Sequence, residues 1–150
     1  ASKHPGNTWI TGRGWDQNRF PSKTFPTNTE LNLLFPNRPV ILQRVDGHAS
    51  IANQTALDLA GVKAGQTILG GAIVVNNGKL TGLLIDNAVD MVTSKIPAAT
   101  KQDYKNWLRA AQQNCFATGL TTITDCGLSP ADIDQVAVTG GALALLARPL

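Results

Sequence analysis

Hydrophobic residues lie along the chain in short runs that are separated by glycine, proline and polar residues. Runs of about four to eight such residues between turn signals are typical of strands. The predicted strands are Trp9–Gly12, Pro39–Val45, Ala72–Val75, Lys79–Leu83 and Leu120–Thr124. The second is apolar over most of its length, which indicates that both of its faces are covered. Asn76-Asn77-Gly78 predicts a tight hairpin between the third and fourth strands, because an Asn-Gly step adopts positive φ at low cost.

Other segments carry the start and stop signals of helices. The shorter predicted helices are Glu30–Leu34, Asn53–Ala60 and Leu84–Thr93. Thr29 and Asn53 are placed to cap the first two at their N-termini. Pro36 ends the first helix, Gly61 is placed to stop the second, and Ile96-Pro97 breaks the third.

The clearest helical pattern starts at Thr100. Asp103 lies three residues later, which is a carboxylate variant of the capping box, and Gly119 is placed to end the helix. One face of this helix carries Tyr104, Trp107, Leu108, Ala111 and Cys115. We therefore expect the helix to be the main core element, with Trp107 and Leu108 packed inside.

Strands and helices alternate without a dividing linker or a repeat, so the pattern predicts a single α/β domain over residues 1–150. Ser129-Pro130 is predicted to open a further helix. The tail Thr139–Leu150 carries almost no charge, and both an apolar helix and an altered end remain open for it. No apolar run approaches the roughly 18 residues of a transmembrane helix.

The composition supports a folded core, since 43% of the residues are hydrophobic and 15% are charged. The net charge is +3, but the basic residues are scattered and only 5% of residues are aromatic, so nucleic-acid binding is not predicted. Cys115 and Cys126 form no Cys-x-x-Cys pair and are interpreted as reduced thiols, with Cys115 buried on its helix face.

Polar residues that could bind a ligand follow the carboxyl ends of predicted strands, where α/β proteins place their sites. The candidate substrate-facing residues are Trp15, Asp16, Arg44, Asp46 and His48. Structural roles remain open for each. Trp15 is equally suited to a core or lid, Asp16 to a turn, and Arg44 with Asp46 to a structural ion pair.

The residues predict no catalytic metal site. Zinc needs three or four converging ligands, whereas the two histidines, His4 and His48, are far apart in sequence. Asp46 and His48 could supply two ligands at most. Cys126 follows Asp125 at a strand end, but no local motif supports a nucleophile there, and neither a Gly-x-Ser-x-Gly elbow nor a phosphate loop is found.

Several strings in order resemble the amidohydrolase-3 family, in the branch that includes N-substituted formamide deformylases. They are Trp9-Ile-Thr-Gly-Arg-Gly-Trp-Asp-Gln17, Arg38-Pro-Val-Ile-Leu-Gln-Arg-Val-Asp-Gly-His48, Asn53-Gln-Thr-Ala-Leu-Asp-Leu-Ala-Gly61, Gly70-Gly-Ala-Ile73, Thr81-Gly-Leu-Leu84 and Gly119-Leu-Thr-Thr-Ile-Thr-Asp125. Each string is weak alone, and the set covers about Trp9 to Gly127. Cys126 departs from the small residue usual in the family, and the match is poor after Pro130.

The resemblance implies a parent enzyme with a (β/α)₈ barrel that uses zinc or a similar divalent metal on amide or formamide C–N bonds. Residues 9–117 would be a small mixed-sheet insertion domain after the first barrel strand. Residues 120–125 would be the second barrel strand, left without its neighbours, and residues 130–150 a poorly matched tail.

On this resemblance the metal ligands lie outside the chain, which forms a wall or lid of the active site and is inactive alone. The partners are then the rest of the barrel, or another copy of the chain through the unpaired strand. The alternative is a stand-alone, non-catalytic binding or assembly module derived from the same family.

Overall fold

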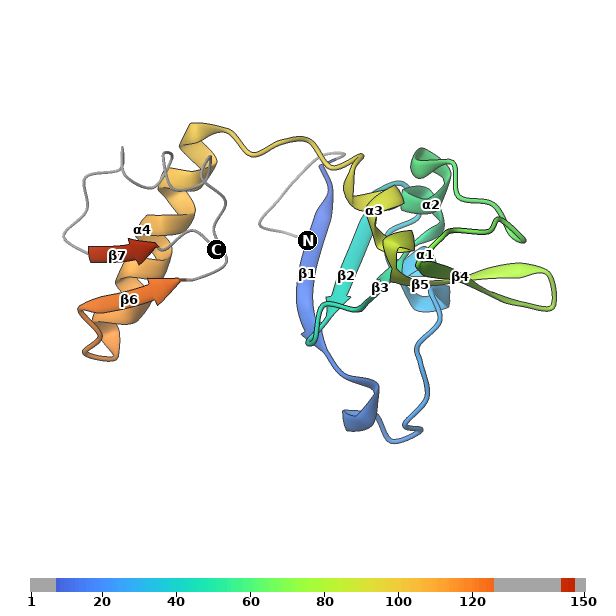
Figure 1. Cartoon of the computed structure of the whole chain (residues 1–150), viewed down its shortest axis with the longest axis horizontal. Helices are drawn as coiled ribbons and strands as arrows, with labels where there is room; N and C mark the ends of the chain where they lie inside the picture. The colour runs from blue at the N-terminus through green and yellow to red at the C-terminus, as the bar shows by residue number, and fades with distance from the viewer. Residues whose placement is uncertain (1–7, 126–143, 148–150) are drawn as a thin grey trace. The chain divides into compact units, whose positions relative to one another are not determined.

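The structure is a computed structural model that describes residues 8–125 and 144–147. The chain divides into two compact units, residues 1–97 and 98–150 (Figure 1). The predicted single domain and the predicted limits of an insertion at residues 9–117 stay predictions about the whole protein. No described helix has both the length and the hydropathy needed to cross a membrane.

The first unit is built on a five-stranded mixed sheet with the order β1-β2-β3-β5-β4. Its strands are β1 (Ile10–Trp15), β2 (Val40–Arg44), β3 (Ala49–Ala52), β4 (Gly71–Asn76) and β5 (Lys79–Asp86). Its helices are η1 (Gln17–Arg19), α1 (Thr29–Leu34), α2 (Gln54–Ala60) and α3 (Asn87–Thr93). β1 and β2 are parallel, and the other neighbouring pairs are antiparallel.

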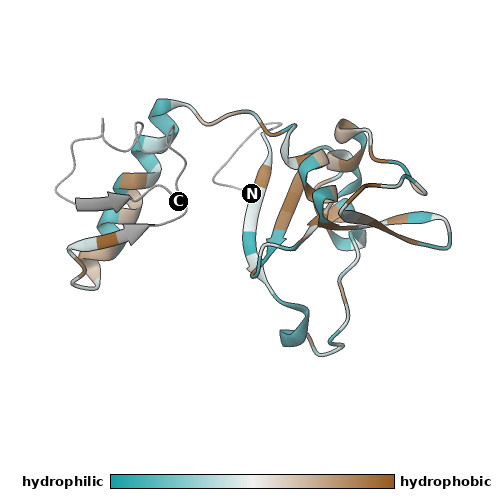
Figure 2. Cartoon of the chain, in the orientation of Figure 1, coloured by the Kyte–Doolittle hydropathy of each residue, from teal (hydrophilic) through white to brown (hydrophobic). Residues whose placement is uncertain are grey.

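Side chains on the two faces of this sheet enter two hydrophobic clusters, because successive residues of a strand point to opposite faces. Ile41, Ala52 and Leu84 pack with residues of α2 and α3 in the larger cluster. Ile51 and Leu83 belong to the smaller cluster on the other face. Figure 2 shows β2 hydrophobic over its first part and hydrophilic at its end, whereas β1 is pale or hydrophilic beyond its first residue. The core therefore lies on β2, β3 and β5, and β1 is an exposed edge.

The predicted hairpin and the cap of α2 are confirmed. β4 and β5 pair in antiparallel fashion around Asn77 and Gly78, whose φ angles of 49° and 74° suit a tight turn. The Asn53 side chain accepts a hydrogen bond from the Ala56 N–H at the start of α2. Gly61 ends this helix in the left-handed conformation, with φ of 68°.

Two predictions about local structure in the first unit were wrong, and one strand was missed. The helix predicted from Leu84 begins at Asn87, since Leu84 and Ile85 belong to β5. The prediction failed because a short apolar run fits either a strand or a helix. β3 was not predicted at all. The N-cap of α1 is Asn28 rather than Thr29, and it makes no side-chain capping bond; its amide instead donates to the Ala52 carbonyl.

The second unit contains α4 (Lys101–Ala117), β6 (Thr122–Asp125) and β7 (Ala144–Ala147). The capping box at the start of α4 is confirmed, since the Thr100 and Asp103 side chains each accept a backbone hydrogen bond. At the other end, the Gly119 N–H donates to Phe116 O and the Leu120 N–H to Cys115 O, with Gly119 at φ of 80°. This is the Schellman pattern that glycine favours.

The predicted role of α4 as the main core element was wrong. The helix contains no buried residue, and 59% of Trp107 is exposed. Leu108 and Cys115 are half-buried, and Trp107 packs edge-on against Tyr104, with 5.6 Å between ring centroids. Helical spacing identifies residues that share a face, but it does not show whether that face is buried.

β6 was predicted to lack a neighbour, and this too was wrong. β6 pairs in parallel with β7, and Thr122 to Asp125 lie opposite Ala144 to Ala147. The helical alternative for the tail therefore fails over these four residues, where β-strand pairing is formed. The predictions about His4, Cys126 and the helix at Ser129-Pro130 lie outside the described residues.

Candidate functional site

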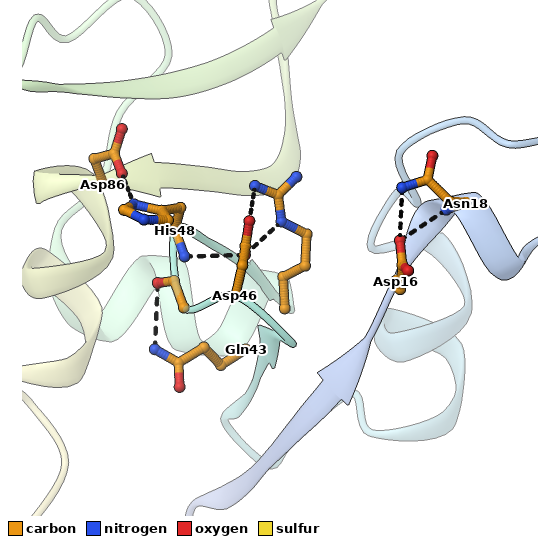
Figure 3. A network of polar contacts seen from close by, with 8 residues as sticks. Asp16, Asn18, Gln43, Asp46, His48 and Asp86 are labelled. Atoms are coloured by element: carbon orange, nitrogen blue, oxygen red, sulfur yellow. Dashed lines mark hydrogen bonds and ion pairs between the residues drawn. The ribbon is translucent and has the colours of Figure 1, made fainter. Parts of the chain in front are cut away.

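The turn between β2 and β3 gathers three of the five candidate residues. Arg44 ends β2, Asp46 stands at the bend, and His48 precedes β3 (Figure 3). Gly47 adopts a φ of 84°, and its N–H donates to the Arg44 carbonyl at 3.0 Å, which closes the turn. The sequence therefore places these side chains together because the turn is tight and glycine accepts its backbone conformation.

Asp46 and Arg44 form a two-pronged ion pair. Arg44 Nε lies 2.7 Å from Asp46 Oδ1, and Arg44 Nη2 lies 2.7 Å from Asp46 Oδ2. The Asp46 carboxylate also accepts a hydrogen bond of 3.1 Å from the His48 N–H. The Arg44 hydrogen bond and then the His48 N–H hold the pKa of Asp46 below its ordinary value. Arg44 and Asp46 therefore form the structural ion pair that the sequence left open as an alternative. The guanidinium group of Arg44 is already bound by Asp46.

Trp15 joins this turn to an aromatic group. Its Nε1–H donates to the Leu42 carbonyl at 2.7 Å, so its polar atom is used within the fold. Its ring stacks on Phe20 and meets Phe25 edge-on, each with a centroid distance of 6.5 Å. The Arg44 guanidinium carbon lies 5.6 Å from the centre of the Phe25 ring. Trp15 and Arg44 therefore share the Phe25 ring as a common neighbour.

Asp16 does not join the cluster. It caps the short helix η1, where its Oδ1 accepts from the backbone N–H of Asn18 at 2.9 Å and from the Asn18 amide at 3.0 Å. Figure 3 shows this pair set apart from Asp46 and His48. Its observed bonds are those of a turn residue, which was the structural alternative left open for it.

His48 has a partner that the sequence reasoning missed. Its Nδ1 lies 2.9 Å from Oδ1 of Asp86, at the end of β5 (Figure 3). The side chains of His48 and Asp86 are 71% and 47% exposed. Asp86 follows the apolar run Leu83–Ile85, so the strand-end signal was present. The same apolar run also fits the start of a helix, and this ambiguity hides the end of the strand.

The described donors do not fit a resident metal ion. No group of three or more His, Cys, Asp or Glu side chains that could hold one occurs within residues 8–125 and 144–147. Both carboxylate oxygens of Asp46 contact Arg44, and His48 contacts Asp86 through Nδ1. A metal would have to displace these partners and would still find too few ligands.

A small pocket lies on the first unit near β1 and the end of α3. It has a volume of about 140 Å³ and is lined by Thr11, Gly12, Ile41, Gln43, Ser50, Thr93 and Ile96. Ser50 is 1% exposed, and its Oγ has no hydrogen-bond partner among the described residues. This volume is below the roughly 300–1,000 Å³ of most small-molecule sites, so the pocket by itself does not define a substrate site.

Comparison with known proteins shows which family this chain belongs to. The model of the amidohydrolase family matches residues 1–140. YtcJ of Bacillus subtilis (strain 168), whose name assigns it to the amidohydrolases, is 37% identical over 119 residues, covering 78% of this chain and 22% of YtcJ. N-substituted formamide deformylase of Arthrobacter pascens is 30% identical over 131 residues, covering 81% of this chain and 23% of that enzyme.

A plant relative is also similar. Protein LONG AFTER FAR-RED 3 of Arabidopsis thaliana is 35% identical over 122 residues, covering 80% of this chain and 21% of that protein. The chain therefore spans about a fifth of the length of these relatives.

Two solved structures share the fold. One is an uncharacterised metal-dependent hydrolase from Pyrococcus horikoshii OT3, with a TM-score of 0.61 and 19% identity. The other is an uncharacterised metal-dependent hydrolase from Pyrococcus furiosus, with a TM-score of 0.60 and 20% identity. The matches cover 98% and 97% of this chain but 29% of each neighbour.

Proposed function

Because the chain belongs to the amidohydrolase family, we propose that it is a segment of a metal-dependent amidohydrolase acting on amide or formamide C–N bonds. In that enzyme the first unit forms a wall or lid of the active site. The observation that carries the proposal is the polar turn between β2 and β3, which lies within the matched residues and presents an exposed His48.

The topology of the second unit supports placing it in a barrel. α4 precedes β6, and β6 pairs in parallel with β7. Parallel strands need a crossover connection, and helices alternating with parallel strands are the repeating unit of a (β/α)₈ barrel. The mixed sheet of the first unit does not follow that repeat, since most of its neighbouring strands are antiparallel. This contrast supports an insertion into a barrel at the first unit.

The turn offers a substrate a hydrogen bond and an apolar contact. His48 is the candidate with the most accessible polar group, since 71% of its side chain is exposed. Phe25 is 44% exposed and lies against Trp15 and Arg44. Arg44 stiffens this surface through its ion pair with Asp46. A substrate carboxylate would have to compete with Asp46 for the same guanidinium group.

Substitution in the whole enzyme tests the wall or lid role. His48→Ala is expected to lower kcat/KM by about tenfold or more, which corresponds to about 1.4 kcal/mol of lost transition-state stabilisation. The melting temperature should stay unchanged, because the His48 side chain is exposed. Lys63→Ala, at another exposed loop position, is the control and should leave kcat/KM unchanged. Equal kcat/KM in the His48 variant and wild type would contradict a substrate-facing role.

The chain by itself is proposed to bind no stoichiometric catalytic metal and to hydrolyse no amide. In the whole enzyme a bound divalent metal would supply an activated water, and its ligands would come from the rest of the barrel. Elemental analysis of chain purified without a metal-affinity tag, with an assay on amide and formamide substrates, tests this. One equivalent of tightly held zinc together with turnover that a chelator abolishes would contradict it. The alternative of a stand-alone module gains support if a start and a stop codon closely flank this sequence in its gene.

A further inference from the structure

We propose that Asp86 is the positioning residue of His48, and that the pair is a binding site for a hydrogen-bond donor such as the N–H of an amide substrate. The inference rests on the proposed function, since it deepens the role given to His48. Two kinds of observation carry it: the cross-strand contact between these residues and the backbone conformation of Asp86.

His48 and Asp86 meet at two points across the β3–β5 pair. The backbone N–H of Asp86 donates to the His48 carbonyl at 2.9 Å, and the side chains meet with 2.9 Å between Nδ1 and Oδ1. The next pair along the strands, Ala49 with Ile85, continues the ladder. The side-chain contact is therefore set by the register of the sheet and joins residues 38 positions apart.

Asp86 keeps this position in a backbone conformation that glycine favours. Its φ of 46° and ψ of −125° lie outside the regions that residues with a Cβ readily adopt. The residues on either side of Asp86 are closely packed: a Cβ on Gly71 would lie 2.6 Å from the backbone nitrogen of Ala88, and the Asn87 amide donates to the Leu69 carbonyl. A strained non-glycine residue held by its surroundings is a reason to look for a function of its side chain.

That function does not lie in fold stability. The side chains of His48 and Asp86 are 71% and 47% exposed, and ion pairs and hydrogen bonds between exposed side chains contribute little to folding. Glycine at this position would relieve the backbone strain, whereas the aspartate maintains it. What the carboxylate adds is a fixed orientation for the exposed imidazole ring.

The carboxylate also selects the tautomer of that ring. An ionised carboxylate only accepts hydrogen bonds, so the nitrogen facing it, Nδ1, must carry a proton. In the neutral ring the other nitrogen, Nε2, then has a lone pair and accepts. A ligand N–H or O–H group can donate to Nε2. A ligand carbonyl oxygen cannot, because both it and Nε2 are acceptors whose lone pairs would repel each other. The same logic orients histidines by carboxylates at many binding sites.

Nitrogen NMR of the imidazole ring in this chain tests the positioning directly. Under mildly alkaline conditions, wild-type His48 is expected to show a protonated Nδ1 and an unprotonated Nε2. Asp86→Asn and Asp86→Gly should both move the proton towards Nε2, the nitrogen that free histidine in water favours. Asp86→Gly also relieves the strained backbone, so it guards against a variant that fails to fold. Asp58→Asn, which removes another exposed carboxylate, should leave the His48 tautomer unchanged.

Kinetics of the whole enzyme then separate this inference from the proposed function. Asp86→Asn is expected to lower kcat/KM several-fold, and to have no further effect once His48 is alanine. An unchanged tautomer in both Asp86 variants would overturn the inference and leave the wall or lid role standing. A loss of activity in His48→Ala without a loss in Asp86→Asn would also overturn the inference and leave the wall or lid role standing. Full activity in both His48→Ala and Asp86→Asn would overturn the substrate-facing role and the inference together.

Discussion

Replacement of Asn53 by alanine is expected to remove four hydrogen bonds from the interior of the first unit. The Asn53 side chain is fully buried. Its Oδ1 accepts from Val40 N at 2.9 Å and from Ala56 N at 3.1 Å. Its Nδ2 donates to Phe35 O at 2.9 Å and to Arg38 O at 2.7 Å. One amide therefore joins the start of β2, the start of α2 and the segment that leads into β2.

The expected cost follows from these four partners. Loss of an N-cap side chain costs about 0.5–2 kcal/mol, and each buried group left without a partner costs about 1–3 kcal/mol. Water can reach some of the freed groups, since Phe35 and Arg38 are half-buried. We therefore expect Asn53→Ala to lower the free energy of unfolding of the first unit by about 3–5 kcal/mol.

Urea unfolding followed by tryptophan fluorescence measures this loss. A Trp107→Phe background confines the signal to the first unit, because the other tryptophans are Trp9 and Trp15. The matched control is Asn32→Ala, which removes one hydrogen bond, from Gln54 N at 2.7 Å to the Asn32 side chain, and should cost about 1 kcal/mol. If the two variants lose the same stability, the Asn53 network does not hold the unit together as argued.

Four further results are expected. Gly82→Ala should destabilise the first unit by about 2–4 kcal/mol in the same assay, because a Cβ would lie 2.5 Å from the Ala52 carbonyl oxygen and the φ of 87° suits glycine; an unchanged midpoint would contradict this. Arg44→Gln should raise the pKa of Asp46, read by carbon NMR of its carboxyl. Because the folded pKa is depressed, the pair stabilises the fold above the ordinary carboxyl pKa, and the contribution is lost as the pH falls through the folded value. Leu108→Ala should cost less than about 1.5 kcal/mol, since the side chain is half-buried, and a larger loss in thermal melts would restore the core role of α4. The chain should self-associate through exposed strand edges such as β1, and light scattering that shows monomer at every concentration would count against this.

The elements that the sequence predicted are those with a local chemical cause. The Asn-Gly turn, the Asn53 cap and the capping box at Thr100 each depend on residues within a few positions of one another. β3 has no such signal, because Ala49-Ser50-Ile51-Ala52 contains one β-branched residue among small ones. Its strand conformation comes from pairing with β2 and β5 on its two sides, and this is tertiary information.

The candidate site shows the same division. The strand-end rule found Arg44, Asp46 and His48, because one short turn holds them together. It also selected Asp16, which follows β1 but bonds to its own helical turn. Asp86 lies 38 positions from His48, and only the β3–β5 register brings them together. A single sequence carries no local trace of such a contact.

The pairing within the turn bears on the kind of substrate that it would meet. The Arg44 guanidinium is matched by the Asp46 carboxylate, and the His48 ring is matched by Asp86. A substrate carboxylate would have to displace Asp46 from Arg44, and that cost would oppose its binding. The N–H of a neutral amide or formamide would need only the Nε2 acceptor of His48. In the proposed wall or lid, we therefore expect the turn to favour uncharged C–N substrates over those with a carboxylate at this position.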